Sequence, residues 1–416
     1  MNVKNVSRHH RRSSLFAIFF VASLDNFGFG IVFILFAPLI LDSSYGMLSP
    51  ETALTFRNLI LGVLFAAFPF TQFFGAPILG DYADRFGRKI AFYVSIVGTT
   101  IGYCLSAIAI DIHHVYLLIF SRLFTGFFAG NLSICLASIA DLSPDEKTRG
   151  KNYGLVGVVW GVSWPIAMIV GGYLSDPKIS PYFNPALPFW ITAFLSILSL
   201  LAIYYYLIET HKGEKTVKIE LLKALKDIKI SLEVRAMRPF FVVLLFWTIG
   251  WGLSVQWYGA FSIEKFGVGQ QLISWALIIQ GLFWVCGGSF VNPFLLQRIS
   301  SWRTGLIGLS WTAIFILFSS FGASFWIFSA VYWVSAIGAA FALSNSLNLI
   351  SLASPEKMQG RAMGLSQSMM SLGWFIVPII GSILGNLDPI FFHVIAAAMV
   401  FVAAGILSFF KPKIAT

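Results

Sequence analysis

The feature that most constrains this fold is a series of long apolar segments, each long enough to cross a membrane. They are centred near residues 28, 68, 100, 127, 163, 197, 250, 281, 314, 338, 373 and 399, and 57% of the 416 residues are hydrophobic. Because a bilayer core of about 30 Å needs about 20 apolar residues per helix, we expect twelve transmembrane helices. The runs are continuous rather than alternating, which favours helices over a barrel. The sequence therefore predicts an all-α polytopic membrane protein.

The first apolar run is interpreted as a retained transmembrane helix. It follows the polar segment 1–14, carries Asp25 and has no clear small-residue cleavage site. A secretory signal peptide would end in such a site. We therefore count this run among the spans.

The basic residues predict the orientation of the spans. With both termini in the cytoplasm, that side collects a basic central loop together with Lys4, Arg8, Arg11, Arg12, Arg85, Arg88, Lys89, Lys147, Arg149, Lys151, Arg298, Arg303, Lys357, Arg361, Lys411 and Lys413. The opposite side holds only Arg57, Lys178 and Lys265. Cytoplasmic loops carry an excess of Lys and Arg, so this asymmetry supports the assignment. We expect a multi-pass protein of a bacterial inner membrane.

The net charge of +10 has a simple interpretation in this setting. A basic cytoplasmic face lies beside anionic headgroups, which makes the lipid bilayer the expected partner and leaves no need for nucleic acid. Cys104, Cys135 and Cys286 occur singly in different apolar segments, so no disulfide or metal framework is expected. The six histidines are scattered as well, and we predict no metal site and no cofactor.

A charged turn, Gly80-Asp81-Tyr82-Ala83-Asp84-Arg85-Phe86-Gly87-Arg88-Lys89, separates the second and third spans. Charged residues make up only 11% of the chain, so this concentration indicates a tight, specified turn at the membrane surface. The segment resembles the signature loop between helices 2 and 3 of the major facilitator superfamily, from which only Tyr82, in place of Leu, departs. The resemblance implies a transporter and says nothing of the cargo.

The same resemblance implies a gate on the cytoplasmic side. Asp84 is expected to contact the start of the eleventh span near Arg361, where a helix N-terminus favours negative charge. Arg88 is expected to pair with Asp141 at the end of the fourth span. The residues assigned to the gating loop are Gly80, Asp84, Arg85, Gly87, Arg88, Asp141 and Arg361.

An internal repeat predicts two similar halves. The loop 143–155 after the fourth span matches the loop 354–365 after the tenth, with the glycines aligned. Parallel repeats of six spans are associated with two pseudo-symmetric six-helix bundles and a substrate site between them near the membrane midplane. We therefore predict bundles over residues 1–208 and 239–416.

A polar, lysine-rich segment, 209–238, joins the two predicted bundles. Within it, Leu221, Leu225, Ile228 and Leu232 fall on one helical face. This spacing predicts an amphipathic helix on the cytoplasmic membrane surface, tethering the bundles.

Two charged residues lie deep within predicted spans, Asp25 in the first and Arg122 in the fourth. Placing a charge at the bilayer centre costs about 2.5–3.5 kcal/mol, so such residues usually face a cavity and have a partner. Their opposite charges make them candidate partners. A carboxylate whose neighbours change between states can load and release a proton. The alternatives are a helix-end carboxylate for Asp25 and a structural clamp for Arg122.

Short motifs surround both of these charges. Arg122, Gly126 and Gly130 are spaced four apart, on one helical face, so neighbouring backbones can approach closely. The run 122–130 resembles the span 4 signature of the superfamily, in which a membrane Arg is linked to proton transfer. The segment 25–30 resembles the first helix of the drug:proton antiporters, including tetracycline efflux proteins. These resemblances imply that Asp25 and Arg122 carry proton coupling.

The fifth span departs from the antiporter pattern. Ala167-Met168 occupies the positions where that group typically has Gly-Pro, and the proline stands earlier, at Pro165. A helix rich in glycine and proline still implies close packing and a bend. The direction of transport is therefore left open.

Polar and aromatic residues in other spans are the weaker candidates for a substrate cavity. They are Asn26, Asn131, Trp251, Gln256, Gln280, Asn345, Asn348 and Gln367. Most of the 42 Phe and 13 Trp side chains are expected to face lipid or other helices. An aromatic, amide-bearing cavity with one acid suits amphipathic or weakly cationic organic cargo.

The sequence favours a secondary active transporter over other classes. The first hypothesis is proton-coupled efflux of drugs or metabolites by a monomer that alternates access to its site. Proton-coupled uptake of an amino acid, nucleoside or organic acid remains an alternative, as does siderophore export. An enzyme is disfavoured because no His, Cys or acidic cluster has catalytic spacing. A non-transporting sensor with the same fold is also considered.

Overall fold

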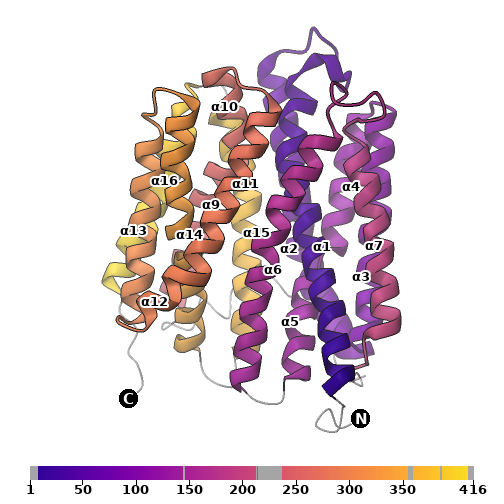
Figure 1. Cartoon of the computed structure of the whole chain (residues 1–416), viewed down its shortest axis with the longest axis vertical. Coiled ribbons are helices and arrows are strands. Elements are labelled where there is room, and N and C mark those ends of the chain that lie inside the picture. Colours follow the sequence, from indigo (N-terminus) through magenta and orange to yellow (C-terminus); the bar gives the residue numbers. More distant parts are fainter. Residues whose placement is uncertain are drawn as a thin grey trace. The chain divides into compact units, whose positions relative to one another are not determined.

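A computed structural model describes residues 8–143, 146–211, 213, 237–354, 359–384 and 387–410. Among these residues every regular element is a helix. The first half contains α1 (Arg8–Leu41), η2 (Ser43–Tyr45), α2 (Leu54–Phe86), α3 (Arg88–Asp111), α4 (Val115–Phe128), α5 (Asn131–Leu142), α6 (Glu146–Leu174) and α7 (Leu187–Tyr206). Figure 1 shows them in indigo to magenta.

The second half is helical in the same way. It contains α9 (Arg238–Gln256), α10 (Tyr258–Phe266), α11 (Gln270–Cys286), the π-helical turn η3 (Gly287–Val291), α12 (Asn292–Leu296), α13 (Ser301–Ser319), α14 (Phe325–Ala353), α15 (Gln359–Leu384) and α16 (Ile390–Phe409). Twelve helices or helix pairs of the described chain are long and apolar enough to cross a membrane. The predicted all-α, twelve-span architecture is confirmed.

Contacts group the chain into two compact units. Unit 1 comprises Met1–Leu35, Asp42–Pro50 and Ala67–Lys223, and unit 2 comprises Phe36–Leu41, Glu51–Ala66 and Ala224–Thr416. Both α1 and α2 therefore contribute residues to each unit. The amphipathic helix expected around residues 221–232 lies outside the described residues.

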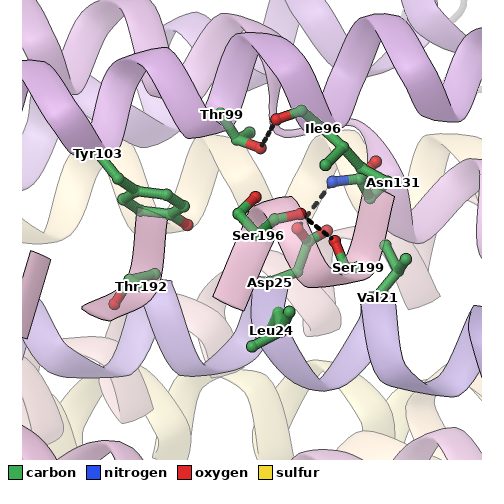
Figure 2. Close-up of a pocket in the computed structure, with 10 residues that line it drawn as sticks. All are labelled: Val21, Leu24, Asp25, Ile96, Thr99, Tyr103, Asn131, Thr192, Ser196 and Ser199. Carbon is green, nitrogen blue, oxygen red and sulfur yellow. Dashed lines mark hydrogen bonds between the residues drawn. The ribbon is translucent and has the colours of Figure 1, made fainter. Parts of the chain in front are cut away.

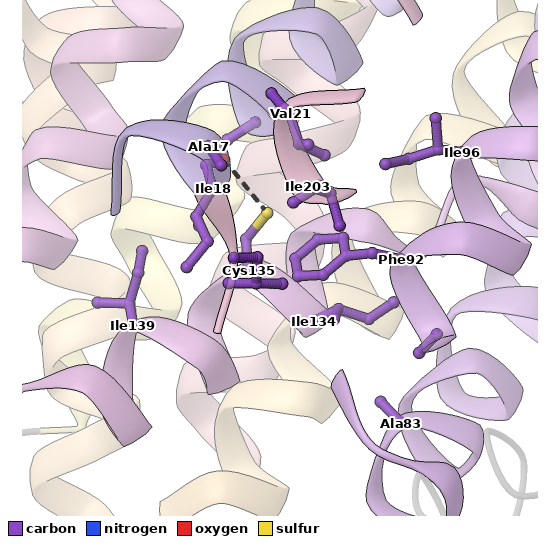
Figure 3. Packing of buried hydrophobic residues seen from close by; sticks show 14 of the residues in the cluster. Ala17, Ile18, Val21, Ala83, Phe92, Ile96, Ile134, Cys135, Ile139 and Ile203 are labelled. Atoms are coloured by element: carbon purple, nitrogen blue, oxygen red, sulfur yellow. Dashed lines mark hydrogen bonds between the residues drawn. The ribbon is translucent and has the colours of Figure 1, made fainter. Parts of the chain in front are cut away.

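The core of unit 1 is built around α3. This helix packs against α4, α5 and α7. Figure 3 shows Cys135 of α5 enclosed by Ile18 of α1, Phe92 of α3 and Ile203 of α7, all fully buried. The Cys135 thiol lies 3.7 Å from the Ile18 carbonyl oxygen. Because lipid tails are as apolar as these side chains, close packing and hydrogen bonds hold the helices together more than apolar burial does.

The fourth span is one apolar run but two helices. The α-helical hydrogen bonding stops at Phe128 and resumes at Asn131, with Ala129 and Gly130 forming a break between α4 and α5. The expected continuous face of Arg122, Gly126 and Gly130 is therefore corrected, since Gly130 lies in the break.

Side chains from two neighbouring helices satisfy the backbone at this break. Gln72 of α2 donates its amide to the Ala129 carbonyl at 2.9 Å. The Ser95 hydroxyl of α3 donates to the Phe128 carbonyl. An unsatisfied carbonyl in the hydrocarbon region costs several kcal/mol, so irregular backbone persists there only where protein groups replace the lost bonds. The break is thus a specified feature of unit 1.

Glycines bring helix backbones together next to the break. A Cβ atom on Gly75 of α2 would overlap the Phe127 carbonyl, and one on Gly126 of α4 would overlap the Phe68 carbonyl. The close approach expected beside Arg122 is therefore present. Any larger residue at these positions would force two backbones apart.

The helices of unit 2 pack through large aromatic residues. The strongest helix pairs are α13 with α14 and α9 with α16. Trp251 of α9 stacks on Tyr332 of α14, with ring centres 6.1 Å apart and planes inclined by 7°. Trp251 also lies 5.3 Å from Trp284 of α11. Trp251 and Tyr332 are both buried, so this aromatic group lies inside the unit.

We predict that Gly75→Ala destabilises the protein by about 1–3 kcal/mol, because the added methyl group collides with rigid backbone rather than with a movable side chain. Gly157→Ala on α6 is the matched control, since a Cβ atom there meets nothing within 4 Å. Thermal unfolding in one detergent compares the two variants. Equal unfolding temperatures for Gly75→Ala and Gly157→Ala would contradict the described α2–α4 contact.

Candidate functional site

Asp25 lies near the middle of α1 and is held by the broken fourth span. Its carboxylate accepts a hydrogen bond from the Asn131 Nδ2 at 2.8 Å. Asn131 is the first residue of α5, so the carboxylate lies beside a helix N-terminus, where the peptide dipoles favour negative charge. Discontinuous membrane helices of transporters place such termini at anionic groups. The break therefore supplies the acid with a buried donor.

The direct pair between Asp25 and Arg122 that their opposite charges suggested is not formed between these two described residues. Arg122 lies nine residues before Asn131, on the other side of the break in the fourth span. Its buried guanidinium lies 4.8 Å from the centre of the Phe68 ring. Tyr103 of α3 interacts electrostatically with both Asp25 and Arg122. The phenol thus lies within range of both charges.

The glycines that follow Asp25 shape this part of the site. A Cβ atom on Gly28 would overlap the Tyr103 hydroxyl, so only glycine lets the phenol reach α1. A Cβ atom on Gly30 would lie 3.0 Å from the side chain of Ala167 on α6. Ala167 is where the fifth span departs from the antiporter pattern, and it packs against α1. Asn26 donates to the Trp160 carbonyl of α6 at 3.0 Å.

A small polar cavity adjoins Asp25 inside unit 1. About 10 Å³ is available to the centres of water-sized molecules, which is about the space of one water. Figure 2 shows its ten lining residues, Val21, Leu24, Asp25, Ile96, Thr99, Tyr103, Asn131, Thr192, Ser196 and Ser199. They come from α1, α3, α5 and α7. A drug-sized molecule does not fit in this space.

The gating loop forms a charge cluster at the end of α2. Arg88 Nη1 lies 2.6 Å from Asp84 Oδ1, and Arg88 Nε lies 3.2 Å from Asp141 Oδ2. The expected contact between Arg88 and Asp141 is therefore present. The guanidinium of Arg85 lies 5.2 Å from the Phe86 ring centre. Of the other gating residues, the Arg361 side chain lies outside the described part of the structure, and Gly80 has open space where a Cβ atom would lie.

The chain after α7 folds back onto this cluster. Both carboxylate oxygens of Glu209 accept backbone amides at the start of α3, from Arg88 at 2.8 Å and from Lys89 at 3.0 Å. Gly87 has a positive φ of 102°, and a Cβ atom on it would lie 2.7 Å from Glu209 Oε2. Glycine is needed there both for the backbone conformation and for the approach of the carboxylate.

Two residues after Glu209 extend this contact. Thr210 donates its hydroxyl to Asp141 Oδ2 at 3.1 Å, the oxygen that Arg88 also contacts. The His211 Nε2 lies 3.1 Å from the Asp84 carbonyl oxygen. The segment entering the central loop is thus bound to the gating loop.

The weaker cavity candidates of unit 2 fall into two groups. Asn345 and Asn348 of α14 bind neighbouring helices, donating to Asn292 Oδ1 at 2.8 Å and to Ser301 Oγ at 2.7 Å. Trp251, Gln256 and Gln280 are buried, and Gln367 is partly exposed. The structure does not bring all these residues to one cavity among its described parts.

Several residues of the site carried no clear signal in the sequence. Tyr103, Thr192 and Ser199 are ordinary residues of apolar helices, and only the fold brings them to Asp25. Glu209 follows the sixth span directly, and its role depends on a contact with the distant start of α3. The Gly130-Asn131 pair was the one available signal for the break, since such pairs are typical of turns.

Twelve membrane-length helices of the described chain define a multi-pass membrane protein, and the acid of α1 and the charged loop after α2 are features expected of a transporter. The sequence model of the Major Facilitator Superfamily matches residues 15–310 and 264–415, so the chain belongs to this superfamily. The expected family is confirmed.

Named relatives are drug resistance proteins. The chain is 24% identical to tetracycline resistance protein, class B, of Escherichia coli, over 78% of this chain and 79% of the relative. It is also 24% identical to the quinolone resistance protein NorA of Staphylococcus aureus, over 83% of this chain and 84% of the relative.

Solved structures share the fold at lower identity. The crystal structure of a D-xylose-proton symporter aligns with a TM-score of 0.76 at 16% identity, covering 97% of this chain and 99% of the symporter. The human organic anion transporter MFSD10 aligns with a TM-score of 0.73 at 17% identity, covering 95% and 99%. These likenesses bear on the fold alone.

We predict that Glu209→Gln speeds hydrogen exchange at the Arg88 and Lys89 amides, because a neutral amide offers one acceptor oxygen where the carboxylate offers two. Loss of such a cap typically costs about 0.5–2 kcal/mol. Exchange of peptides covering the start of α3 measures the effect, with exposed Glu51→Gln as control. Unchanged exchange in Glu209→Gln would show that this carboxylate does not cap α3.

Proposed function

We propose that this transporter exports a small organic molecule in exchange for protons, with Asp25 as the group that carries the proton. The observation that carries the proposal is a carboxylate near the middle of the membrane-length helix α1, held by Asn131 at the break in the fourth span. A partly buried acid with one neutral donor, and without a fixed cation partner among the described residues, can exist in both protonation states. Such an acid suits reversible loading of a proton.

Two further features support efflux of a drug-like or metabolic cargo. The named relatives include tetracycline and quinolone resistance proteins, whose names identify them with drug resistance. The segment from Asp25 to Gly30 resembles the first helix of the drug:proton antiporters. Its glycines let Tyr103 and Ala167 pack closely against α1. Uptake stays the second candidate because Ala167-Met168 replaces the usual antiporter residues and a D-xylose-proton symporter shares the fold.

Arg122 acts in this proposal through the surroundings of the acid. Its guanidinium interacts electrostatically with Tyr103, which also interacts with Asp25. A movement of α3 or α4 would change the electrostatic potential at the Asp25 carboxylate even though Asp25 and Arg122 form no direct ion pair. Arg122 is therefore a positioning residue for the proton site.

The cytoplasmic gate is proposed to depend on Arg88. The Arg88 guanidinium binds both Asp84 and Asp141, and Thr210, which follows α7, donates a hydrogen bond to the Asp141 carboxylate. Such a cluster favours one arrangement of α2, α3 and α5 at that end of the unit. The protein is proposed to work as a monomer in a bacterial inner membrane, with both termini in the cytoplasm.

We predict that Asp25→Asn abolishes transport driven by a pH gradient, because an amide cannot take up or release the proton. Proteoliposomes with an imposed gradient test this with tetracycline, a quinolone and D-xylose as separate probes. Asp176→Asn is the control, since Asp176 lies in an exposed loop and accepts the Lys178 amide. Proton-driven D-xylose accumulation on the cytoplasmic side would favour uptake over efflux. Equal drug export by wild type and Asp25→Asn would refute the role of Asp25.

A further inference from the structure

Three of the hydroxyl groups that line the cavity beside Asp25 already donate their protons to backbone carbonyls. Thr99 donates to the Ile96 carbonyl at 3.1 Å, Thr192 to the Pro188 carbonyl at 2.7 Å, and Ser199 to the Ser196 carbonyl at 2.8 Å. Each hydroxyl oxygen therefore presents lone pairs rather than a proton to its surroundings. Figure 2 shows these three residues of α3 and α7 among those that line the cavity.

A polar cavity of this size admits only a small occupant. Water is small enough, and it can donate two hydrogen bonds to a carboxylate and to hydroxyl oxygens. Asp25 is partly rather than fully buried, and its carboxylate accepts only one hydrogen bond from the described chain. It therefore has acceptor capacity left for a second donor in the cavity.

The cavity belongs to unit 1 alone. Its lining comes from α1, α3, α5 and α7, without any residue of unit 2 among those described. A drug-sized cargo has no room in about 10 Å³. The cavity beside Asp25 is therefore large enough for a water molecule and too small for the cargo.

We propose that this cavity is a water site through which the proton reaches Asp25, separate from the place where cargo binds. An arriving hydronium transfers one proton to the ionised carboxylate, which leaves a neutral carboxyl group and a water molecule. The proton comes from bulk water, and no other reactant is needed. This inference rests on the proposed role of Asp25 in proton coupling.

Other titratable and charged groups near Asp25 are few among the described residues. Tyr103 lies on α3, Cys135 lies on α5, and Arg122 on α4 acts through Tyr103. Thr192 and Ser199 on α7 do not titrate. The water site is thus expected to serve Asp25 and no second acid of this unit.

Infrared difference spectra of the purified protein, recorded between high and low pH, test this without knowledge of the cargo. Wild type should show a carboxyl band that Asp25→Asn removes, together with a water stretching band that shifts in H₂¹⁸O. Thr192→Val keeps the shape of the side chain and removes one acceptor, so it should shift or abolish the water band. Thr312→Val is the matched control, because Thr312 is also buried and donates to the carbonyl four residues earlier, at 2.7 Å, on α13.

The outcomes separate this inference from the proposed function. An Asp25 carboxyl band without any ¹⁸O-sensitive water band, or equal spectra for Thr192→Val and Thr312→Val, would overturn the water site and leave proton coupling intact. A water band that responds to NaCl rather than to pH would overturn the proposed water site and indicate a sodium site. Absence of an Asp25 carboxyl band would overturn both proposals. If Thr192→Val does not fold, Ser199→Ala removes a different acceptor of the same cavity and is expected to give the same shift.

Discussion

The hydrogen bonding of the break in the fourth span is the constraint on which the rest of this site depends. In the hydrocarbon region a carbonyl without a partner costs several kcal/mol, so a helix can be interrupted only where other protein groups take over. Gln72 and Ser95 do so for Ala129 and Phe128. Because the interruption is stabilised in this way, a new helix begins at Asn131 within the fourth span. The start of that helix then holds the Asp25 carboxylate.

Glycine positions decide which side chains can surround this carboxylate. Gly28 admits the Tyr103 hydroxyl against α1, and Gly75 lets α2 approach the backbone of α4. Substituting either residue would move a helix or a ring away from Asp25. Tyr103 lies near both the acid and Arg122, which form no direct pair with each other. This arrangement leaves the carboxylate with one neutral hydrogen-bond donor among the described residues, Asn131, a condition that suits a group with two protonation states.

The sequence predicted the spans, the two buried charges and the Arg88–Asp141 contact, because each depends on local composition or on a family pattern. It did not predict the break, since residues 115–142 form one uninterrupted apolar run. The partners of Asp25 were also hidden. Thr192 and Ser199 line the cavity beside it only because α7 packs on α3, and Asn131 was considered a cavity residue rather than a donor to the acid. The surroundings of Asp25 depend on how distant segments pack together, which the types of single residues do not predict.

The pH dependence of proton-driven transport in Asn131→Leu, beside Asn131→Ser, tests the central claim most directly. The Asn131 amide donates to the ionised carboxylate, so its removal favours the protonated acid. The account predicts that the pH midpoint of transport moves upward in Asn131→Leu, while cargo exchange without a gradient is retained. Asn131→Ser, which keeps a hydroxyl donor, should move it less. An unchanged midpoint in Asn131→Leu would contradict the claim that the broken fourth span holds the proton-carrying acid.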